Sequence, residues 1–193
     1  MFCFSLLALV ASASASVYSN SKCPETKPVS NFNLTAYGQG IWYEVARYPN
    51  FAEIGGNCGY GEYKLDGDPI RVKNVHIENN KRVWIEGIAG LHKDANGLGK
   101  LVYVFPYGDN GAETEHMLEV LDTDYDNYAI GYYCKYNEKD NSRQDFAWIL
   151  SRSKVLPFHV KKIVNRYVHE SKVLDTSKFM WPDFSDGACR VEN

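Results

Sequence analysis

Short hydrophobic segments alternate with turn residues along most of the chain. Each segment is rich in aromatic and β-branched residues, which favour a pleated, half-buried surface. The first expected strand begins near Trp42 and stops at Pro49, which has no amide hydrogen to donate to a ladder. The other seven expected strands span residues 58–65, 70–78, 81–90, 98–107, 113–121, 128–136 and 144–151. Eight strands in hairpin succession, with no helix between them, favour an up-and-down barrel or a sandwich.

The hydrophobic period changes after the last of these strands. Residues 157–170 have helical spacing, and Pro157 stands in the first turn, where proline is tolerated. A single amphipathic helix after eight strands is expected to pack on the outside of the barrel. Its buried face is expected to carry Phe158, Ile163, Val164, Tyr167 and Val168.

The beginning of the chain has the pattern of an export signal. Residues 2–10 form an apolar segment that is too short to span a bilayer, and Ala13 and Ala15 fit the small-x-small rule for cleavage. We therefore expect residues 1–15 to be a signal peptide and residues 16–193 to form one secreted domain. No other stretch approaches the roughly 20 apolar residues that a membrane helix needs.

Export changes the meaning of the cysteines, because disulfides form in oxidising compartments. Loss of the signal discards Cys3 and leaves four cysteines, which allow two disulfides in three connectivities. These four are Cys23, Cys58, Cys134 and Cys189, and no two of them have the C-x-x-C spacing of a zinc or redox site. Residues 16–37 are expected to form an extended arm tied down by Cys23. Export also makes Asn33 a usable glycosylation site in an Asn-Leu-Thr triplet.

Composition and charge narrow the class of function. A net charge of −3 and the lack of a basic run argue against nucleic acid as a partner. The chain has no nucleophile elbow, zinc-protease helix, phosphate loop or dinucleotide fingerprint, and its five histidines have no metal-ligand spacing. Its 14 tyrosines, 9 phenylalanines and 4 tryptophans fit either a β-rich core or an aromatic pocket. The sequence is typical of a binding protein, with catalytic carboxylates inside a barrel as a minor alternative.

Three short motifs stand in a characteristic order. Gly40-Ile41-Trp42 opens the first strand, Thr123-Asp124 precedes a strand that begins at Tyr128, and Ser151-Arg152-Ser153 ends the last strand before the helix. This order resembles the lipocalin family along essentially the whole mature chain. Segments 23–25, 42–46, 131–136 and 150–156 look most like the insect bilin-binding lipocalins.

The resemblance implies a fold and two covalent links. The fold would be an all-β, eight-stranded, up-and-down antiparallel β-barrel with one C-terminal α-helix packed outside. The disulfides would join Cys23 to Cys134 and Cys58 to Cys189. Trp42 would pack near Arg152 at the closed end in a cation–π contact.

The resemblance also implies a set of ligand-facing positions. Phe51 would line the entrance with its neighbours Asn50, Ala52 and Glu53. The remaining positions are Asn74, His76, Ile85, Phe105, Tyr107, Tyr133, Lys135, Gln144 and Phe146. Hydrophobic alternation alone would turn the strand at 70–78 the other way, because Val75 and Ile77 are apolar.

The implied function is non-covalent binding of a linear tetrapyrrole, a biliverdin-type bilin, for pigmentation and for bilin storage or transport. The main alternative is a carrier of another small hydrophobic ligand such as a fatty acid, sterol or odorant. An isomerase or a heme-bearing nitric-oxide carrier, and an inhibitor that acts through its open-end loops, are the alternatives from other classes. A homo-oligomer is compatible with the sequence, and no metal is expected.

Overall fold

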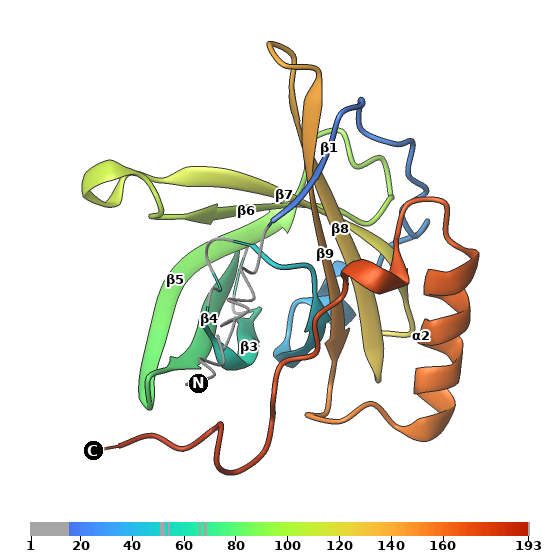
Figure 1. The fold of residues 1–193 in the computed structure, drawn as a ribbon. Coiled ribbons are helices and arrows are strands. Elements are labelled where there is room, and N and C mark those ends of the chain that lie inside the picture. Colours follow the sequence, from blue (N-terminus) through green and yellow to red (C-terminus); the bar gives the residue numbers. More distant parts are fainter. Residues whose placement is uncertain (1–15, 51–52, 54, 66, 68, 193) are drawn as a thin grey trace, which may run out of the picture.

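A computed structural model describes residues 16–50, 53, 55–65, 67 and 69–192 (Figure 1). The predicted signal peptide and the predicted contacts Phe51 and Ala52 lie outside the described residues. The elements in chain order are β1 (Val17–Ser19), α1 (Leu34–Tyr37), β2 (Gly40–Arg47), β3 (Asn57–Lys64), β4 (Ile70–Glu78), β5 (Lys81–Leu91), β6 (Lys100–Phe105), η2 (Asp109–Gly111), β7 (Thr114–Thr123), β8 (Tyr128–Asn137), β9 (Ser142–Ser151), α2 (Phe158–Glu170) and η3 (Thr176–Lys178).

The eight strands β2 to β9 form a closed antiparallel barrel. Each pairs with the next along the chain, and β9 pairs with both β8 and β2, so no strand of the barrel is left as a free edge. The predicted eight-stranded up-and-down barrel is therefore confirmed. The barrel strands begin and end within three residues of their expected positions.

Hydrophobic side chains form two cores, one on each side of the barrel wall. The inner core fills the closed end of the barrel and contains Trp42, Ile70 and Leu101. The outer core lies between the strands and α2 and contains Ile130 and Ile149. Because side chains alternate across a strand, β8 and β9 serve both cores at once. Helix α2 accordingly packs against the outside of the barrel, as expected (Figure 1).

The buried face of α2 differs from the expected one. The helix begins after Pro157 and buries Val160, Val164 and Val168, which stand four residues apart on one line. Phe158 is 74% exposed and Ile163 is 38% exposed, so their assignment to the core was wrong. Residues 158 and 163 lie on other sides of the helix than the three valines. Packing against the barrel selected the valine side as the buried face.

The N-terminal arm is more regular than expected. Strand β1 pairs with residues 143–145 of β9, beyond the segment of β9 that pairs with β2. The short helix α1 is capped by Asn33, whose side-chain oxygen accepts a hydrogen bond from the Ala36 amide at 3.0 Å. Residues 16–37 therefore do not form the extended arm that was expected. They form a short strand, a linker and one helical turn.

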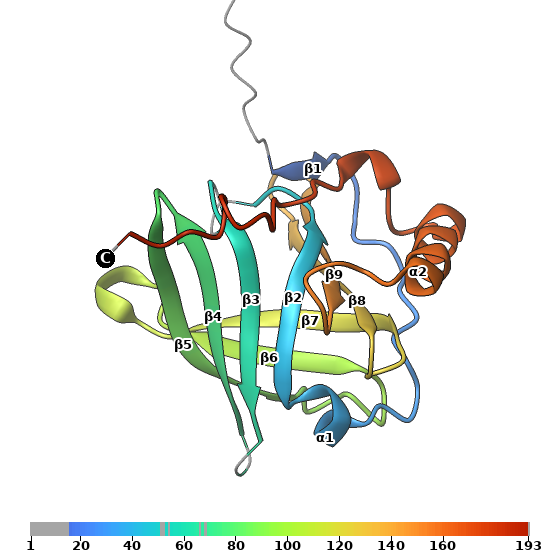
Figure 2. The same ribbon diagram turned by 90° about the horizontal axis from the view of Figure 1, so that it is seen from below.

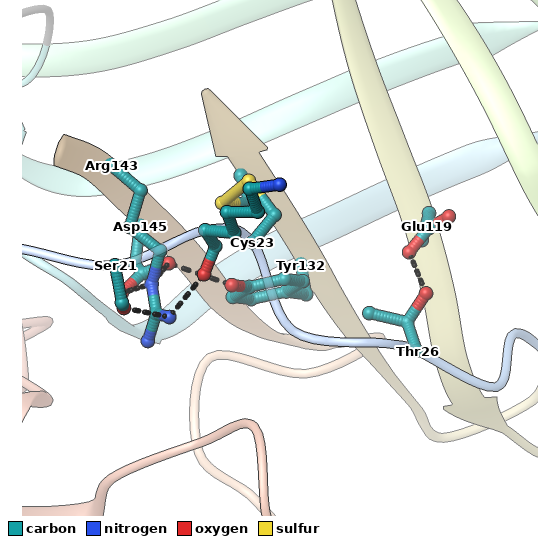
Figure 3. The surroundings of a disulfide bond; sticks show 9 residues. Ser21, Cys23, Thr26, Glu119, Tyr132, Arg143 and Asp145 are labelled. Atoms are coloured by element: carbon teal, nitrogen blue, oxygen red, sulfur yellow. Dashed lines mark hydrogen bonds and ion pairs between the residues drawn. A yellow bond between two sulfur atoms is a disulfide. The ribbon is translucent and has the colours of Figure 1, made fainter. Parts of the chain in front are cut away.

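A disulfide and several polar contacts hold this arm against the barrel (Figure 3). Cys23 is bonded to Cys134 of β8. Arg143 of β9 donates a hydrogen bond to the Ser21 hydroxyl at 2.7 Å and forms an ion pair with Asp145 at 3.0 Å. Thr26 hydrogen-bonds Glu119 of β7. The arm therefore crosses and fastens three neighbouring strands.

The C-terminal segment runs past one end of β3, β4 and β5 (Figure 2). Cys189 is bonded to Cys58 of β3, and Glu192 hydrogen-bonds Asn80 in the β4–β5 turn. Both disulfides have the pairing that the resemblance implied. Each terminal segment is thus fixed to the barrel by one covalent bond.

The closed end is held by Arg152, which follows β9. Its guanidinium lies 3.5 Å from the centre of the Trp42 ring and donates hydrogen bonds to backbone carbonyls at Ala36, Gln39 and Ile41. Trp42 donates to the Tyr37 carbonyl at 3.0 Å. This cation–π contact matches the expected one and ties α1 to β2 below the lumen.

Candidate ligand-binding site

Two adjoining cavities occupy the open half of the barrel. The larger has a volume of about 440 Å³ and the smaller about 240 Å³. They share four lining residues, Glu44, Glu53, Asn74 and Tyr107. The two cavities therefore behave as compartments of one lumen.

The described candidate residues all line this lumen. Asn74 and Tyr107 border both compartments, and His76 and Ile85 border the smaller one. The larger compartment is lined by Phe105, Tyr133, Lys135, Gln144 and Phe146, and also by Asn50 from the expected entrance. The structure thus brings together side chains from β4, β5, β6, β8 and β9.

Two aromatic stacks form parts of the wall. On β8 and β9, Tyr133 and Phe146 are stacked with ring centres 5.6 Å apart, and Trp148 continues this stack at 6.2 Å. On β6, Tyr103 and Phe105 are stacked at 6.1 Å. Such flat surfaces suit a flat, conjugated or otherwise apolar ligand.

Polar groups are spaced between the aromatic residues. Lys135 and Gln144 are cross-strand neighbours on β8 and β9, as are Tyr133 and Phe146. His116 also lines the larger compartment and lies 2.8 Å from the Thr114 hydroxyl. Burial, and then the Lys135 charge, lower the pKa of His116 below its ordinary value, so this imidazole is neutral at pH 7.

Strand β4 shows why alternation alone gives the wrong orientation. Ile70 and Val72 belong to the inner core, which places Asn74 and His76, of the same parity, toward the lumen. Val75 and Ile77 have the opposite parity and are nevertheless buried. The strand is apolar on both faces, so hydrophobicity carries no signal for its direction.

Three tyrosines close the inner end of the lumen. The Tyr103 hydroxyl lies 3.1 Å from that of Tyr63 and 3.4 Å from that of Tyr37. Burial raises the pKa of each of these hydroxyls, so all three stay protonated. Tyr63 and Tyr103 line the larger compartment and were not among the expected ligand contacts.

Charged lining residues also went unrecognised, among them Glu44 and Arg47 of β2. They are three apart in sequence, which in a regular strand would place them on opposite faces. The pairing of β2 with β9 shifts between Glu44 and Ala46, and this bulge turns both side chains inward. A β-bulge of one extra residue has no clear signature in the sequence. Only the structure therefore shows that Glu44 and Arg47 both face the lumen.

Arg47 is fixed by the segment that follows β2. Its Nε lies 2.9 Å from a carboxylate oxygen of Glu53, and its Nη2 donates to the backbone carbonyls of Glu53 and Gly56 at 2.8 and 3.0 Å. Asn50 donates to the same Glu53 carboxylate at 2.5 Å. Burial and the Glu53 charge raise the pKa of Glu44 well above its usual range, against the smaller opposing effect of Arg47.

The larger compartment reaches a seam in the barrel wall. Strands β7 and β8 pair only from Glu119 to Thr123 and from Ala129 to Tyr132. Beyond this stretch, Met117 of β7 and Lys135 of β8 still line the cavity. The unpaired ends of β7 and β8 therefore form part of the wall of the larger compartment.

Within the residues that the structure describes, no helix has the length and apolar character needed to cross a membrane. The described part of the chain also holds no cluster of three or more histidine, cysteine or acidic side chains arranged to bind a metal ion. The arrangement is that of a pocket with a few placed polar groups.

The chain resembles known proteins over nearly its whole length. It is 47% identical to the bilin-binding protein of Pieris brassicae, covering 97% of both chains, and 36% identical to insecticyanin-B of Manduca sexta, covering 97% of this chain and 91% of that one. The solved structure of insecticyanin from the tobacco hornworm Manduca sexta superposes with a TM-score of 0.86 at 37% identity, covering 92% and 94% of the two chains. These relatives confirm the resemblance to the insect bilin-binding lipocalins.

A family model gives the same result independently of any single relative. The model of the lipocalin / cytosolic fatty-acid binding protein family matches residues 39–185, which include all eight barrel strands and α2. The chain therefore belongs to the lipocalin family, whose members are non-enzymatic carriers of small hydrophobic ligands.

Proposed function

We propose that this lipocalin binds a linear tetrapyrrole of the biliverdin type, non-covalently, in the barrel lumen. The observation that carries the proposal is the pair of stacked aromatic walls, Tyr133–Phe146–Trp148 and Tyr103–Phe105, with polar side chains set between them. A linear tetrapyrrole has matching chemistry, because it is flat and conjugated but carries ring nitrogens, lactams and two propionates.

Each part of the pigment has a partner of suitable chemistry. Tyr133 and Phe146 pack on its rings. Asn74, His76 and Gln144 satisfy its polar atoms, which would otherwise lose hydrogen bonds on leaving water. Lys135 attracts a propionate. The rigid wall limits twisting of the conjugated chain and so fixes its colour.

The proposed biological use is blue pigmentation, with storage or transport of a heme breakdown product. The chain would be exported after loss of residues 1–15. Two disulfides support this assignment, because such bonds persist in oxidising compartments. The bilin-binding protein of Pieris brassicae, at 47% identity, supports the choice of ligand.

A visible absorption titration of the refolded, disulfide-bonded mature chain with biliverdin tests the proposal. The expected result is a sharpened long-wavelength band, saturation near one pigment per chain, and induced circular dichroism from a chiral site. A spectrum identical to that of free pigment, recorded with folded protein, would refute the bilin assignment.

The pocket assignment has a test of its own. Replacing Asn74 and His76 together by leucine should weaken biliverdin binding or shift its absorption band, because two lumen-facing polar partners are lost. A matched double variant replaces Arg71 and Lys73, which have the opposite parity on the same strand. Equal behaviour of the two double variants would show that β4 does not contact the pigment.

A fatty acid is the second candidate ligand, and Lys135 is the observation that favours it, since a carboxylate head group could pair with this lysine inside the apolar cavity. Displacement distinguishes the two ligands. A fluorescent fatty acid that binds tightly and is not displaced by biliverdin would favour the lipid carrier.

A further inference from the structure

Glu44, Arg47 and Glu53 form a charged cluster in the lumen. The β2 bulge places the first two on the inner face, and the following segment brings Glu53 to them. Both glutamates line both compartments, so the cluster stands where the two compartments join. Gly59 leaves room for it, because a Cβ atom there would lie 2.8 Å from a carboxylate oxygen of Glu44.

The charges of this cluster do not balance when every group is ionised. Two carboxylates face one guanidinium, and Arg47 already engages Glu53. Glu44 and Glu53 line the same part of the lumen, and two carboxyl groups beside one guanidinium are balanced only when one of them carries a proton. Burial and the Glu53 charge favour that proton, which makes the cluster neutral in the free protein.

Among the residues that the structure describes, Arg47 is the cation that interacts with Glu44 and Glu53. Tyr63 of β3 and Tyr107, which follows β6, are ionisable groups that interact with the pair, and burial keeps both hydroxyls protonated. His76 borders the smaller compartment. Lys135 and the neutral His116 border the larger compartment beside β7 and β8. Glu115 of β7 also borders the larger compartment. Glu44 and Glu53 therefore stand where the compartments join, and Lys135 borders only the larger one.

We propose that the Glu44–Glu53 pair is the specificity determinant of the pocket and selects a ligand with a basic, imine-type ring nitrogen. This inference rests on the proposed function and identifies the atom of the pigment that is recognised. The proton of the pair moves from the Glu44 carboxyl to the lone pair of the ring nitrogen, leaving a carboxylate beside a cationic pigment. The cluster then holds two negative and two positive charges, counting Arg47, and remains balanced.

The chemistry predicts a choice between two closely related pigments. Biliverdin has an imine-type nitrogen, whereas bilirubin, reduced at the central bridge, has only pyrrole-type N–H groups. Both carry the same lactams and propionates, so contacts at Lys135 and Gln144 do not discriminate between them. The pair should therefore favour biliverdin and hold it protonated at a pH at which free biliverdin is neutral.

The test compares the wild-type protein with Glu44→Gln, and uses Glu62→Gln as the matched control, since Glu62 lies on the outer face of β3 and lines neither compartment. Biliverdin and bilirubin are titrated between about pH 7 and 9, above the ordinary pKa of histidine. Pyrene, a flat hydrocarbon with no hydrogen-bonding group, reports whether the cavity is intact. Glu53→Gln provides a second variant should Glu44→Gln fail to fold.

We expect wild type and Glu62→Gln to bind biliverdin with the red-shifted spectrum of the protonated pigment. In Glu44→Gln the bound pigment should show the neutral spectrum, and the preference for biliverdin over bilirubin should fall about tenfold, as for loss of one charge-assisted hydrogen bond. Pyrene binding should not change.

Two results would overturn the inference in different ways. If wild type binds biliverdin but Glu44→Gln has the same spectrum and the same pigment preference, the pair has no such role and the proposed function stands. If the wild-type protein binds pyrene but neither pigment, the proposed function fails and this inference fails with it.

Discussion

At the scale of single residues, Glu44 makes the free energy of unfolding depend on pH. Its carboxyl is buried near the Glu53 charge in the folded chain but is solvated in the unfolded chain, so its pKa is higher when folded. The folded state then binds more protons between the two pKa values, and the free energy of unfolding falls as pH rises through that window. Below the pKa of the unfolded chain, about 4.3, Glu44 is protonated in both states. The free energy of unfolding then no longer changes with pH through this group, and its contribution to stability is fully present.

Glu44→Gln should remove this dependence. We expect the free energy of unfolding of wild type to decline above about pH 5 with a slope of at most about 1.4 kcal/mol per pH unit from this group, and that of the variant to decline less. Urea unfolding of the disulfide-intact chain at a series of pH values measures both slopes. Parallel curves for the two proteins would contradict a proton held by Glu44.

Arg152 offers a second prediction at this scale, because one side chain joins three segments. It stacks on Trp42 and donates to the carbonyl of Ala36 within α1, to that of Gln39 just after α1, and to the Tyr125 carbonyl at 3.0 Å. Arg152→Lys keeps the charge but loses the planar fork, so we expect a loss of about 2–3 kcal/mol of stability. Lys154→Arg, at an exposed neighbouring position, is the control and should leave the denaturation midpoint unchanged.

At the scale of elements, the sequence predicted which segments are strands but not always which face is buried. Strand β4 is apolar on both faces, so its lumen face, with Asn74 and His76, followed from the family resemblance. Strand β2 breaks alternation at its bulge, and no pattern of residues revealed that Glu44 and Arg47 share a face. The positions of the strands could be predicted because turn residues mark their ends. The buried face of a strand could not be predicted where packing against a neighbouring element determines it.

Helix α2 gives a direct test of this difference. Val164 is fully buried, whereas Phe158, which the sequence placed on the same face, is 74% exposed. Val164→Ala should therefore lower the free energy of unfolding by about 2 kcal/mol, through lost burial and the cavity left behind, while Phe158→Ala should change it by less than about 0.5 kcal/mol. Chemical denaturation of both variants decides the matter, and a larger loss for Phe158→Ala would reverse our assignment of the helix face.

At the scale of the whole molecule, the two terminal segments act as straps on a closed barrel. The sulfur bridges span 111 and 131 residues of chain, Cys23 to Cys134 and Cys58 to Cys189. Long closed loops lose the most conformational freedom in the unfolded state, so each bridge is expected to contribute about 4–5 kcal/mol in the chain-entropy model. The barrel itself closes through hydrogen bonds between β9 and β2, without help from either bridge.

Stability and binding should therefore be separable at Cys23–Cys134. Cys134 faces the arm, whereas its neighbours Tyr133 and Lys135 face the lumen. Replacing both cysteines by serine should lower the free energy of unfolding by about 3–5 kcal/mol and leave pyrene affinity within about twofold at a temperature where the variant is folded. Urea unfolding and a fluorescence titration on the same preparation measure the two quantities. If the variant folded but no longer bound pyrene, the disulfide to the N-terminal arm would be needed to keep the lumen-facing side chains of β8 in position. Stability and binding would then not be separable.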